Sequence, residues 1–385
     1  MKDFITGYLA SLIPVPFALE QDGETQTIGN GTPLFTVTLH KPLEKKELLK
    51  STSLALAEAY MRGDLTVDKE LYYVLDHFLG EMAKFTTDTH ALKHILHPSS
   101  TKRHQKEEVS SHYDIGNDFY RLWLDPTLSY SCAYFKNDTD TLEQAQRNKV
   151  DHILEKLQLK EDMTLLDIGC GWGFLLLEAA KKYHIKGVGI TLSEEQAKEF
   201  QHRIEENGLS DRLSVQLMDY RDLPKSGLTF DRVVSVGMLE HVGRDHYDLF
   251  LSCVYDVLKE GGLFLLHYIS ALQEHPGDAF IKKYIFPGGC IPSLREIIHL
   301  MGDHRFYTLD VESLRRHYNK TLLCWLANFR ACRDKVVDMH GEEFARMWEL
   351  YLASCAATFH NGIIDLHQIL MSKGVNNDLP MTRTV

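Results

Sequence analysis

Three side chains that can transfer protons or bind metals lie in or near apolar segments of this chain. Glu240 follows the apolar segment 232–237, and His267 lies inside the apolar segment 263–268. An acid and an imidazole in such surroundings favour acid–base chemistry over a solvated surface, whereas a lone histidine in an apolar run is also typical of a protein core. Together with Cys132 they are a candidate zinc triad with an open fourth position, a weaker signal because the three residues are far apart in the sequence.

The segments around these residues predict strands that alternate with helices. Five short apolar runs have the composition of buried strands: 164–167, 186–191, 213–218, 232–237 and 263–268. Helical spacing is found at 141–157, 174–183, 193–207 and 246–258. This order predicts an α/β fold with a mostly parallel sheet, in which ligands bind beyond the carboxyl ends of the strands. We therefore expect the site at that edge of the sheet.

A glycine-rich turn after the first predicted strand indicates a nucleotide cofactor. Gly169, Gly171 and the next alternate glycine let the backbone turn tightly and approach a ligand just before a helix. A dinucleotide fingerprint would require glycine at Phe174 and an acidic residue near Thr191, and no Gly-Lys-Ser/Thr follows that would make a P-loop. The turn is instead similar to the S-adenosylmethionine turn of class I methyltransferases. A turn without a ligand is the simpler alternative.

Polar residues follow the next two predicted strands. Thr191 and Gln196 stand where they could bind the ribose or adenine in place of a carboxylate, and Tyr220, after the third strand, could stack on the base. Ser193 and Gln196 also have the spacing of a capping box, so the same segment can be read as an ordinary helix start.

Length and charge limit the class of protein. A chain of 385 residues exceeds the usual size of one core, so we expect a small N-terminal α+β domain over 1–95, a polar linker over 96–111 and a larger domain over 112–385 that ends in helices over 321–373. The net charge of −12 argues against a nucleic-acid partner, whereas a local patch can still bind a membrane. Seven cysteines without a Cys-x-x-Cys pair are typical of a reducing cytosol.

Several motifs, taken together, resemble those of the cyclopropane-fatty-acyl-phospholipid synthases, including the mycolic acid cyclopropane synthases. The most specific are Tyr-Ser-Cys-Ala-Tyr at 130–134, Glu-His-Val-Gly at 240–243 and Tyr-Asn-Lys-Thr-Leu at 318–322, which accompany the glycine turn. The resemblance covers most of 112–385, and the segment 60–64 is similar to the N-terminal domain of the bacterial phospholipid enzymes. It implies a Rossmann-like class I methyltransferase fold with a helical cover.

The resemblance implies an S-adenosylmethionine-dependent methyltransferase that adds a methylene to a cis double bond of a phospholipid acyl chain through a carbocation, with bicarbonate as base. The implied bicarbonate ligands are the backbone of Cys132 and Ile269 and the side chains of Glu240, His267 and Tyr318. The implied cofactor ligands are Tyr130, Ser131, Gly169, Gly171, Thr191, Leu192, Gln196 and Tyr220. Two anions at hydrogen-bond distance repel, so Glu240 or bicarbonate must share a proton, and a positive His267 would offset the repulsion.

The resemblance also implies partners and a location. The expected substrate is an unsaturated phospholipid in a bilayer, reached by a cytoplasmic homodimer that associates transiently, as a peripheral protein, with the inner face of the membrane. One alternative of the same fold stays open, a C-methyltransferase that methylates an olefinic lipid or a small acceptor without closing a ring. The intact glycine turn disfavours a lipid carrier without catalytic activity.

Overall fold

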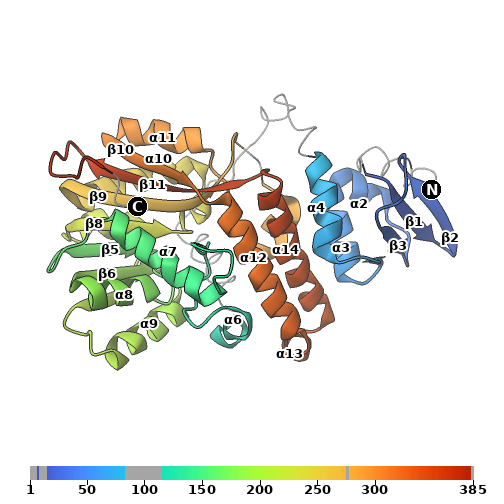
Figure 1. Cartoon of the computed structure of the whole chain (residues 1–385), viewed down its shortest axis with the longest axis horizontal. Helices are drawn as coiled ribbons and strands as arrows, with labels where there is room; N and C mark the ends of the chain where they lie inside the picture. Colours follow the sequence, from blue (N-terminus) through green and yellow to red (C-terminus); the bar gives the residue numbers. More distant parts are fainter. Residues whose placement is uncertain (1–6, 8–14, 83–114, 275–276, 383–385) are drawn as a thin grey trace. The chain divides into compact units, whose positions relative to one another are not determined.

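The computed structural model describes residues 7, 15–82, 115–274 and 277–382, which form two units (Figure 1). The larger unit contains the described residues of 95–276 with 288–317 and 365–385, and the smaller unit contains those of 1–94 with 277–287 and 318–364. Residues 318–364 therefore group with the N-terminal segment in the smaller unit. The expected linker, 96–111, lies outside the described residues.

A seven-stranded sheet with the strand order β10-β11-β9-β8-β5-β6-β7 forms the centre of the larger unit. All five predicted strands are present and pair in parallel, which confirms the α/β class and the mostly parallel sheet. They are β5 (Thr164–Ile168), β6 (Lys186–Thr191), β7 (Leu213–Leu217), β8 (Phe230–Val236) and β9 (Leu258–Ser270). The central strands β5 and β8 are covered on both faces, which explains their almost continuously apolar sequences.

Two antiparallel strands extend the sheet beyond β9. Strand β11 (Asp365–Lys373) pairs with β9, and β10 (Phe306–Ser313) pairs with β11 at the edge. The expectation of helices throughout 321–373 is therefore wrong for its last part. Leu366, Ile369 and Leu370 have helical spacing, but the strand that they belong to is buried on both faces, so the alternation typical of a half-exposed strand is missing.

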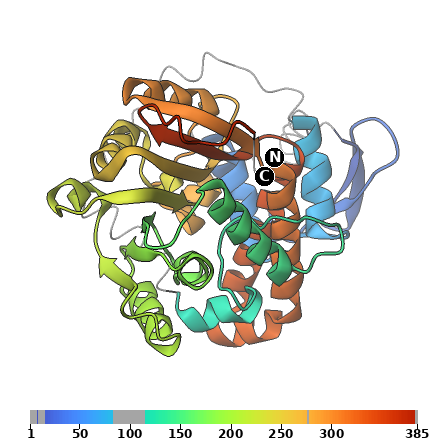
Figure 2. The ribbon, with the colours of Figure 1, turned by 60° about the vertical axis from the view of Figure 1, so that its left-hand side comes forward.

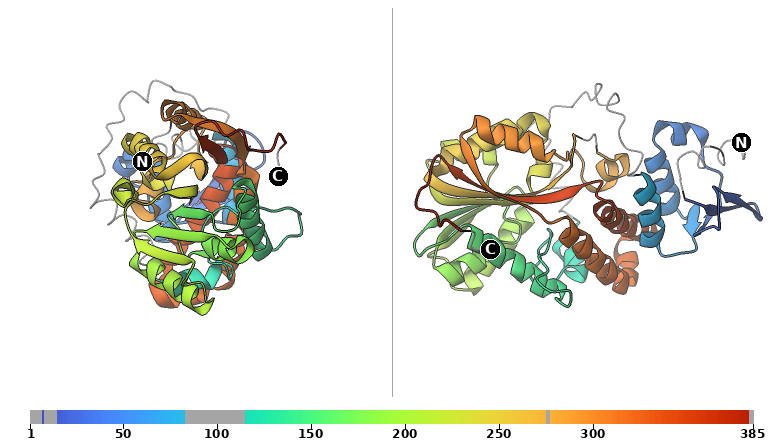
Figure 3. Two further views of the ribbon diagram at one scale, coloured as in Figure 1. Left: turned by 90° about the vertical axis from the view of Figure 1, so that its left-hand side faces the viewer. Right: turned by 45° about the horizontal axis from the view of Figure 1, so that its top comes forward.

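Helices cover both faces of this sheet (Figure 2, Figure 3). One face carries α7 (Leu142–Lys156), α8 (Phe174–Tyr183) and α9 (Glu194–Glu206), and the other carries α10 (Tyr247–Val257) and α11 (Leu294–Asp303). The short helices η2 (Tyr220–Lys225), η3 (Leu239–His241) and η4 (Arg244–His246) lie in the connections near β7 and β8. Helix α6 (Asn117–Trp123) is tied to the glycine turn, because Trp172 Nε1 donates a hydrogen bond to Asn117 Oδ1 (2.9 Å).

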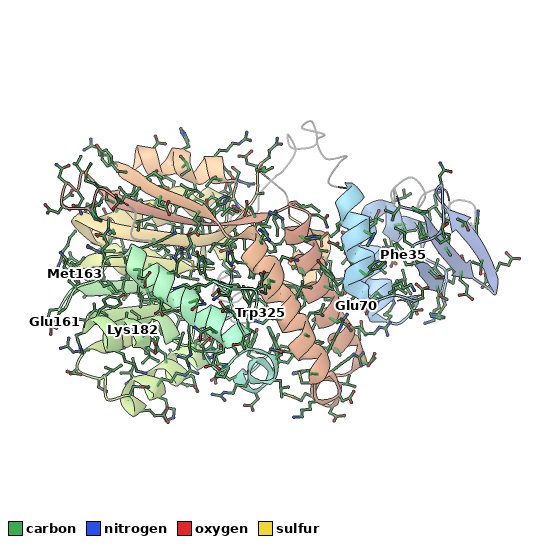
Figure 4. The ribbon with its side chains drawn as sticks, in the orientation of Figure 1. Phe35, Glu70, Glu161, Met163, Lys182 and Trp325 are labelled. Atoms are coloured by element: carbon green, nitrogen blue, oxygen red, sulfur yellow. The ribbon has the colours of Figure 1, made fainter. Side chains whose placement is uncertain are left out.

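The smaller unit has a separate sheet with the order β2-β1-β3-β4, and its described N-terminal part is α+β as expected. The strands are β1 (Phe17–Gln21), β2 (Glu24–Ile28), β3 (Thr36–Leu39) and β4 (Leu65–Val67). The helices of this part are α2 (Lys45–Lys50), α3 (Thr52–Met61) and α4 (Leu71–Met82). Phe35, labelled in Figure 4, is buried in the core that the sheet and these helices share.

Later segments of the chain complete the smaller unit. They are α12 (Arg315–Ala331, from residue 318 onward), α13 (Arg333–His340), α14 (Glu342–His360) and the short helix η5 (Ile281–Ile285). Helix α14 packs against α3 and α4. None of the helices in the described part of the chain combines the length and the apolar composition that crossing a bilayer requires.

Candidate active site

The turn after β5 is built from glycines with left-handed backbone angles. Gly169, Gly171 and Gly173 have φ angles of 81°, 55° and 81°, a region that strongly favours glycine. A Cβ at Gly173 would meet the ring of Phe200 at 1.9 Å, so this glycine allows α8 and α9 to approach each other. A Cβ at Gly171 would meet nothing within 4 Å, which leaves this part of the backbone open to a ligand.

A cavity of about 160 Å³ lies over this turn, at the carboxyl ends of the parallel strands. All eight residues expected to bind the cofactor line it: Tyr130, Ser131, Gly169, Gly171, Thr191, Leu192, Gln196 and Tyr220. They come from four separate segments of the chain, which the parallel topology brings to one edge of the sheet. The cavity wall also contains Trp172, whose ring lies 5.5 Å from that of Tyr120.

The segment at the end of β6 both caps a helix and lines the cavity. The Ser193 hydroxyl accepts a hydrogen bond from the Gln196 backbone (3.3 Å) and caps α9, which confirms the helix start. The Thr191 hydroxyl donates to Gln196 Oε1 (2.8 Å), and both side chains are buried in the cavity wall. The helix cap and the cavity wall are therefore formed by the same few residues.

Tyr220 begins η2, the short helix that follows β7, and lines the cavity. Its ring packs edge-on against Phe250 (5.3 Å), and its hydroxyl has no hydrogen-bond partner among the described residues. Burial raises the pKa of this phenol, so the hydroxyl stays protonated and can donate to a ligand.

Two buried ionisable residues of the cavity wall were not predicted from the sequence. Asp167 is the penultimate residue of β5. One of its carboxylate oxygens has no hydrogen-bond partner in the described structure, and burial raises the pKa of its carboxyl. Lys149 of α7 donates to the Ser131 hydroxyl (2.9 Å), and burial lowers the pKa of its ammonium. Asp167 stands beside the glycine motif and could have been found there, whereas nothing near Lys149 in the sequence marks it.

Glu240, in η3, reaches the end of β9. Its Oε1 accepts a hydrogen bond from the Ile269 backbone nitrogen (2.6 Å), so the amide expected to bind bicarbonate contacts Glu240 in this structure. Its Oε2 is buried and has no hydrogen-bond partner among the described residues. Burial raises the pKa of this carboxyl to about 7, although the bond from Ile269 opposes the shift. Glu240 can therefore carry a proton near neutral pH.

His267 is fully buried on β9, two residues before Ile269. Its Nδ1 lies 3.1 Å from Gln368 Nε2, and its Nε2 has no hydrogen-bond partner among the described residues. Burial, with smaller contributions from Lys149 and Lys156, lowers the pKa of His267 well below its usual value. Burial therefore favours a neutral imidazole at His267 over the positive one that could offset the repulsion.

The remaining expected residues are placed as follows. Cys132 is fully buried in the larger unit, and its thiol donates to the Ala133 carbonyl (3.3 Å). Tyr318 belongs to the smaller unit, where its ring lies 4.6 Å from Phe359 and 6.0 Å from Trp325, which is labelled in Figure 4. The described residues contain no group of three His, Cys, Asp or Glu side chains placed to hold a metal, so the zinc triad lacks geometric support.

Comparisons with known proteins point to one family. The family model described as mycolic acid cyclopropane synthetase matches residues 100–369, and a model of a domain of unknown function matches residues 4–90. A Pseudomonas putida protein named "Probable fatty acid methyltransferase" is 40% identical over 371 residues, covering 94% of this chain and 93% of the relative. The cyclopropane-fatty-acyl-phospholipid synthase of Escherichia coli is 39% identical over 365 residues, covering 92% of each protein.

A solved structure agrees with these relatives. Mycolic acid cyclopropane synthase CmaA1, in a crystal structure of its complex with SAH and CTAB, is 37% identical to this chain, with a TM-score of 0.66. The match covers 72% of this chain and 99% of the solved one. Because the family model spans most of the chain and the two sequence relatives match nearly all of it, the chain belongs to the mycolic acid cyclopropane synthetase family and is an S-adenosylmethionine-dependent methyltransferase.

Proposed function

We propose that this chain is a lipid cyclopropane synthase, which transfers a methylene from S-adenosylmethionine to a cis double bond of an unsaturated phospholipid acyl chain with bicarbonate as base. The observation that carries the proposal is a pair of buried polar atoms, Glu240 Oε2 and His267 Nε2, that lack hydrogen-bond partners among the described residues. Glu240 stands between Met238 and His241, which line the cofactor cavity. Buried polar atoms are costly unless a ligand satisfies them, and we propose that a small oxyanion is this ligand.

The cavity wall suits the charges of the cofactor, whose bound form supplies an electrophilic methyl group. Asp167 and Lys149 offer one acidic and one basic group to the same cavity, which matches the ammonium and the carboxylate of an amino acid. Tyr130 and Trp172 add aromatic faces, which stabilise nearby positive charge and exclude water that would trap a cation.

The base site suits bicarbonate, which accepts the proton released when the ring closes. A protonated Glu240 can donate from Oε2 while its Oε1 keeps the bond from the Ile269 amide. A neutral His267 can donate from Nε2. Two neutral donors bind an anion without bringing a second negative charge into the buried site.

We expect the activity at constant bicarbonate concentration to fall as the pH rises through about 7, the pKa to which burial raises Glu240. Below this pH the carboxyl is protonated and donates to the anion, and above it the carboxylate repels the anion. The measurement is the KM for bicarbonate between pH 6 and 8. A KM that stays constant or improves with pH would contradict a protonated Glu240.

Asp167→Asn should weaken S-adenosylmethionine binding about 10- to 100-fold, because a hydrogen bond to a charged group contributes roughly 1.5–3 kcal/mol. Asparagine keeps the size of the side chain and removes its charge. Calorimetric titration with the cofactor measures the change. Asp231→Asn is a control of the same chemistry, since Asp231 lies outside the cavity wall and contacts Lys259 instead; cofactor binding should be unchanged in this variant.

The deciding experiment incubates the protein with vesicles of unsaturated phospholipid, S-adenosylmethionine and bicarbonate. Detection of a cyclopropane ring in the acyl chain supports the proposal. The name of the Pseudomonas putida relative, a fatty acid methyltransferase, favours one alternative, a C-methyltransferase that acts without ring closure. A product that gains the same mass but keeps a double bond would establish this alternative and refute the ring-forming reaction.

The proposed substrate implies where the enzyme works. An acyl chain within a phospholipid lies in a bilayer, so we propose a cytoplasmic homodimer that acts transiently at the inner face of the membrane and has no nucleic-acid partner. The name of the Escherichia coli relative supports a phospholipid substrate, and the net charge of −12 disfavours nucleic acid. Vesicle flotation measures the association with the membrane, and analytical ultracentrifugation measures the formation of the homodimer.

A further inference from the structure

A row of polar residues crosses the antiparallel part of the larger sheet. Glu312 of β10 is the register partner of Gln368 of β11, and Gln368 is the register partner of His267 of β9. Side chains of directly opposite residues point to the same face of a sheet. This face is the one covered by α7, because Lys156 and His152 of that helix contact the row.

Lys156 links the members of the row and is only 5% exposed. Its ammonium donates to Glu312 Oε2 (2.5 Å) and to Gln368 Oε1 (3.1 Å), and lies 3.1 Å from Asp310 Oδ2. Burial raises the pKa of the Glu312 carboxyl, but the bonds from His152 and Lys156 outweigh it and bring the pKa to about 2. Glu312 therefore stays ionised at neutral pH and holds the ammonium in place.

The position of Lys156 determines the orientation of the Gln368 amide. A lysine ammonium has only donors, so the Gln368 atom that faces it must be the carbonyl oxygen. The amide nitrogen then lies on the other side, 3.1 Å from His267 Nδ1. Because an amide nitrogen only donates, Nδ1 must be unprotonated, and the neutral imidazole must carry its proton on Nε2. Nε2 is the atom of His267 that lacks a hydrogen-bond partner among the described residues.

We propose that Lys156 and Gln368 are positioning residues that hold His267 in the tautomer protonated on Nε2, and that Nε2 donates a hydrogen bond to bicarbonate. The first part concerns only residues of this chain, and the second part rests on the proposed function. The arrangement provides a donor without a buried positive charge on the ring, which would be costly at this depth.

Aromatic contacts hold the other end of the row. The His152 ring stacks on Tyr134 (4.2 Å, 17° between planes) while its Nε2 contacts Glu312 Oε2 (2.6 Å). Tyr134 stacks in turn on His317 (4.7 Å, 8°), whose Nδ1 accepts a hydrogen bond from the Phe135 backbone (3.0 Å). The stacked rings fix the position of Glu312 through His152, and the ion pairs with Glu312 and Asp310 keep Lys156 close to Gln368.

NMR of the ligand-free full chain with 15N-labelled histidine reads the tautomer directly, because the two ring nitrogens of a neutral imidazole resonate far apart. The His267 signals, among those of 20 histidines, are the ones lost in His267→Gln. We expect an unprotonated Nδ1 in the wild type. In Gln368→Glu, one carboxylate oxygen can keep Lys156 as partner and the other accepts from the ring, so Nδ1 should become protonated.

Ser372→Ala is the matched control. Ser372 is buried on the same strand, four residues beyond Gln368, and its hydroxyl bonds to the Gly374 carbonyl. Loss of this hydroxyl should lower the stability of the protein without changing the tautomer of His267, so Nδ1 of His267 should stay unprotonated. A protonated Nδ1 in the wild type, or an Nδ1 that remains unprotonated in Gln368→Glu, would overturn the positioning role.

Kinetics separate this role from the proposed function. Gln368→Met removes the amide, so part of the His267 population should adopt the other tautomer, and the KM for bicarbonate should rise about three- to ten-fold, the value of one hydrogen bond. The KM for S-adenosylmethionine should not change. A changed tautomer with an unchanged bicarbonate KM would retain the positioning role and refute His267 as a bicarbonate ligand. Absence of ring product in the wild type would refute the proposed function alone.

Discussion

Gly171→Val is expected to abolish S-adenosylmethionine binding in a protein that remains folded. Gly171 has φ 55°, and a Cβ there would contact no protein atom within 4 Å. The backbone strain costs roughly 1–2 kcal/mol, while the branched side chain projects into the space over the turn that a ligand would use. We expect the affinity to fall at least about 100-fold, equivalent to roughly 3 kcal/mol, in calorimetric titration.

Gly208→Val is a control that introduces similar backbone strain without obstructing the cofactor cavity. Gly208 has φ 65°, and a Cβ there would also meet no atom within 4 Å, but the residue follows α9 and lies outside the cavity wall. Its thermal stability should fall about as much as that of Gly171→Val, and its cofactor affinity should match the wild type. Normal binding by Gly171→Val would show that the turn does not approach the cofactor.

Glu240→Leu is expected to lower the rate of ring formation about 10²- to 10⁴-fold, because it should displace the proposed bicarbonate, and a positioned base usually contributes this much. The substitution removes both the bond to the Ile269 amide and the donor that we propose for bicarbonate. Affinity for S-adenosylmethionine should change little, because Glu240 does not line the cofactor cavity. Single-turnover analysis of the lipid product, paired with cofactor titration, measures the two quantities separately.

Glu240→Gln is the informative companion. Its carbonyl oxygen can accept from Ile269, and its NH₂ group can replace the acid proton as a donor. It should therefore retain more activity than Glu240→Leu and lose the dependence on pH around 7. Equal losses in the two variants would mean that Glu240 must exchange a proton during turnover, and wild-type turnover in Glu240→Leu would refute the base site.

The cofactor cavity could be predicted from the sequence because its determinants are local. A strand, a glycine turn and a helix follow one another around Gly169, and the polar residues Thr191 and Tyr220 lie at or just beyond the ends of predicted strands. Their spatial convergence then follows from a parallel sheet. Lys149 could not be found in this way, because it belongs to a helix that precedes the first strand of this sheet and only the folded structure brings it to Ser131.

The protonation states in the proposed base site could be predicted only in part: charge repulsion requires a proton on Glu240 or bicarbonate, but the neutral state of His267 does not follow from the sequence. The raised pKa of Glu240 and the lowered pKa of His267 are consequences of burial, which depends on residues distant in the chain. The contact of His267 with Gln368 requires strand β11, whose doubly buried sequence has the spacing of a helix. One wrong secondary-structure prediction therefore concealed the residues that orient the imidazole.

The place of β11 in the sheet has a consequence for the order of folding. Strand β9 pairs with β8 on one side and with β11 on the other, although about 95 residues separate its end from the start of β11. During synthesis, the second edge of this apolar strand has no partner until β11 emerges, and pairing over such a distance is slow and prone to aggregation. We therefore expect a nascent chain released before residue 365 to be captured by chaperones. Such a chain already contains the glycine turn, but His267 lacks its contact with Gln368.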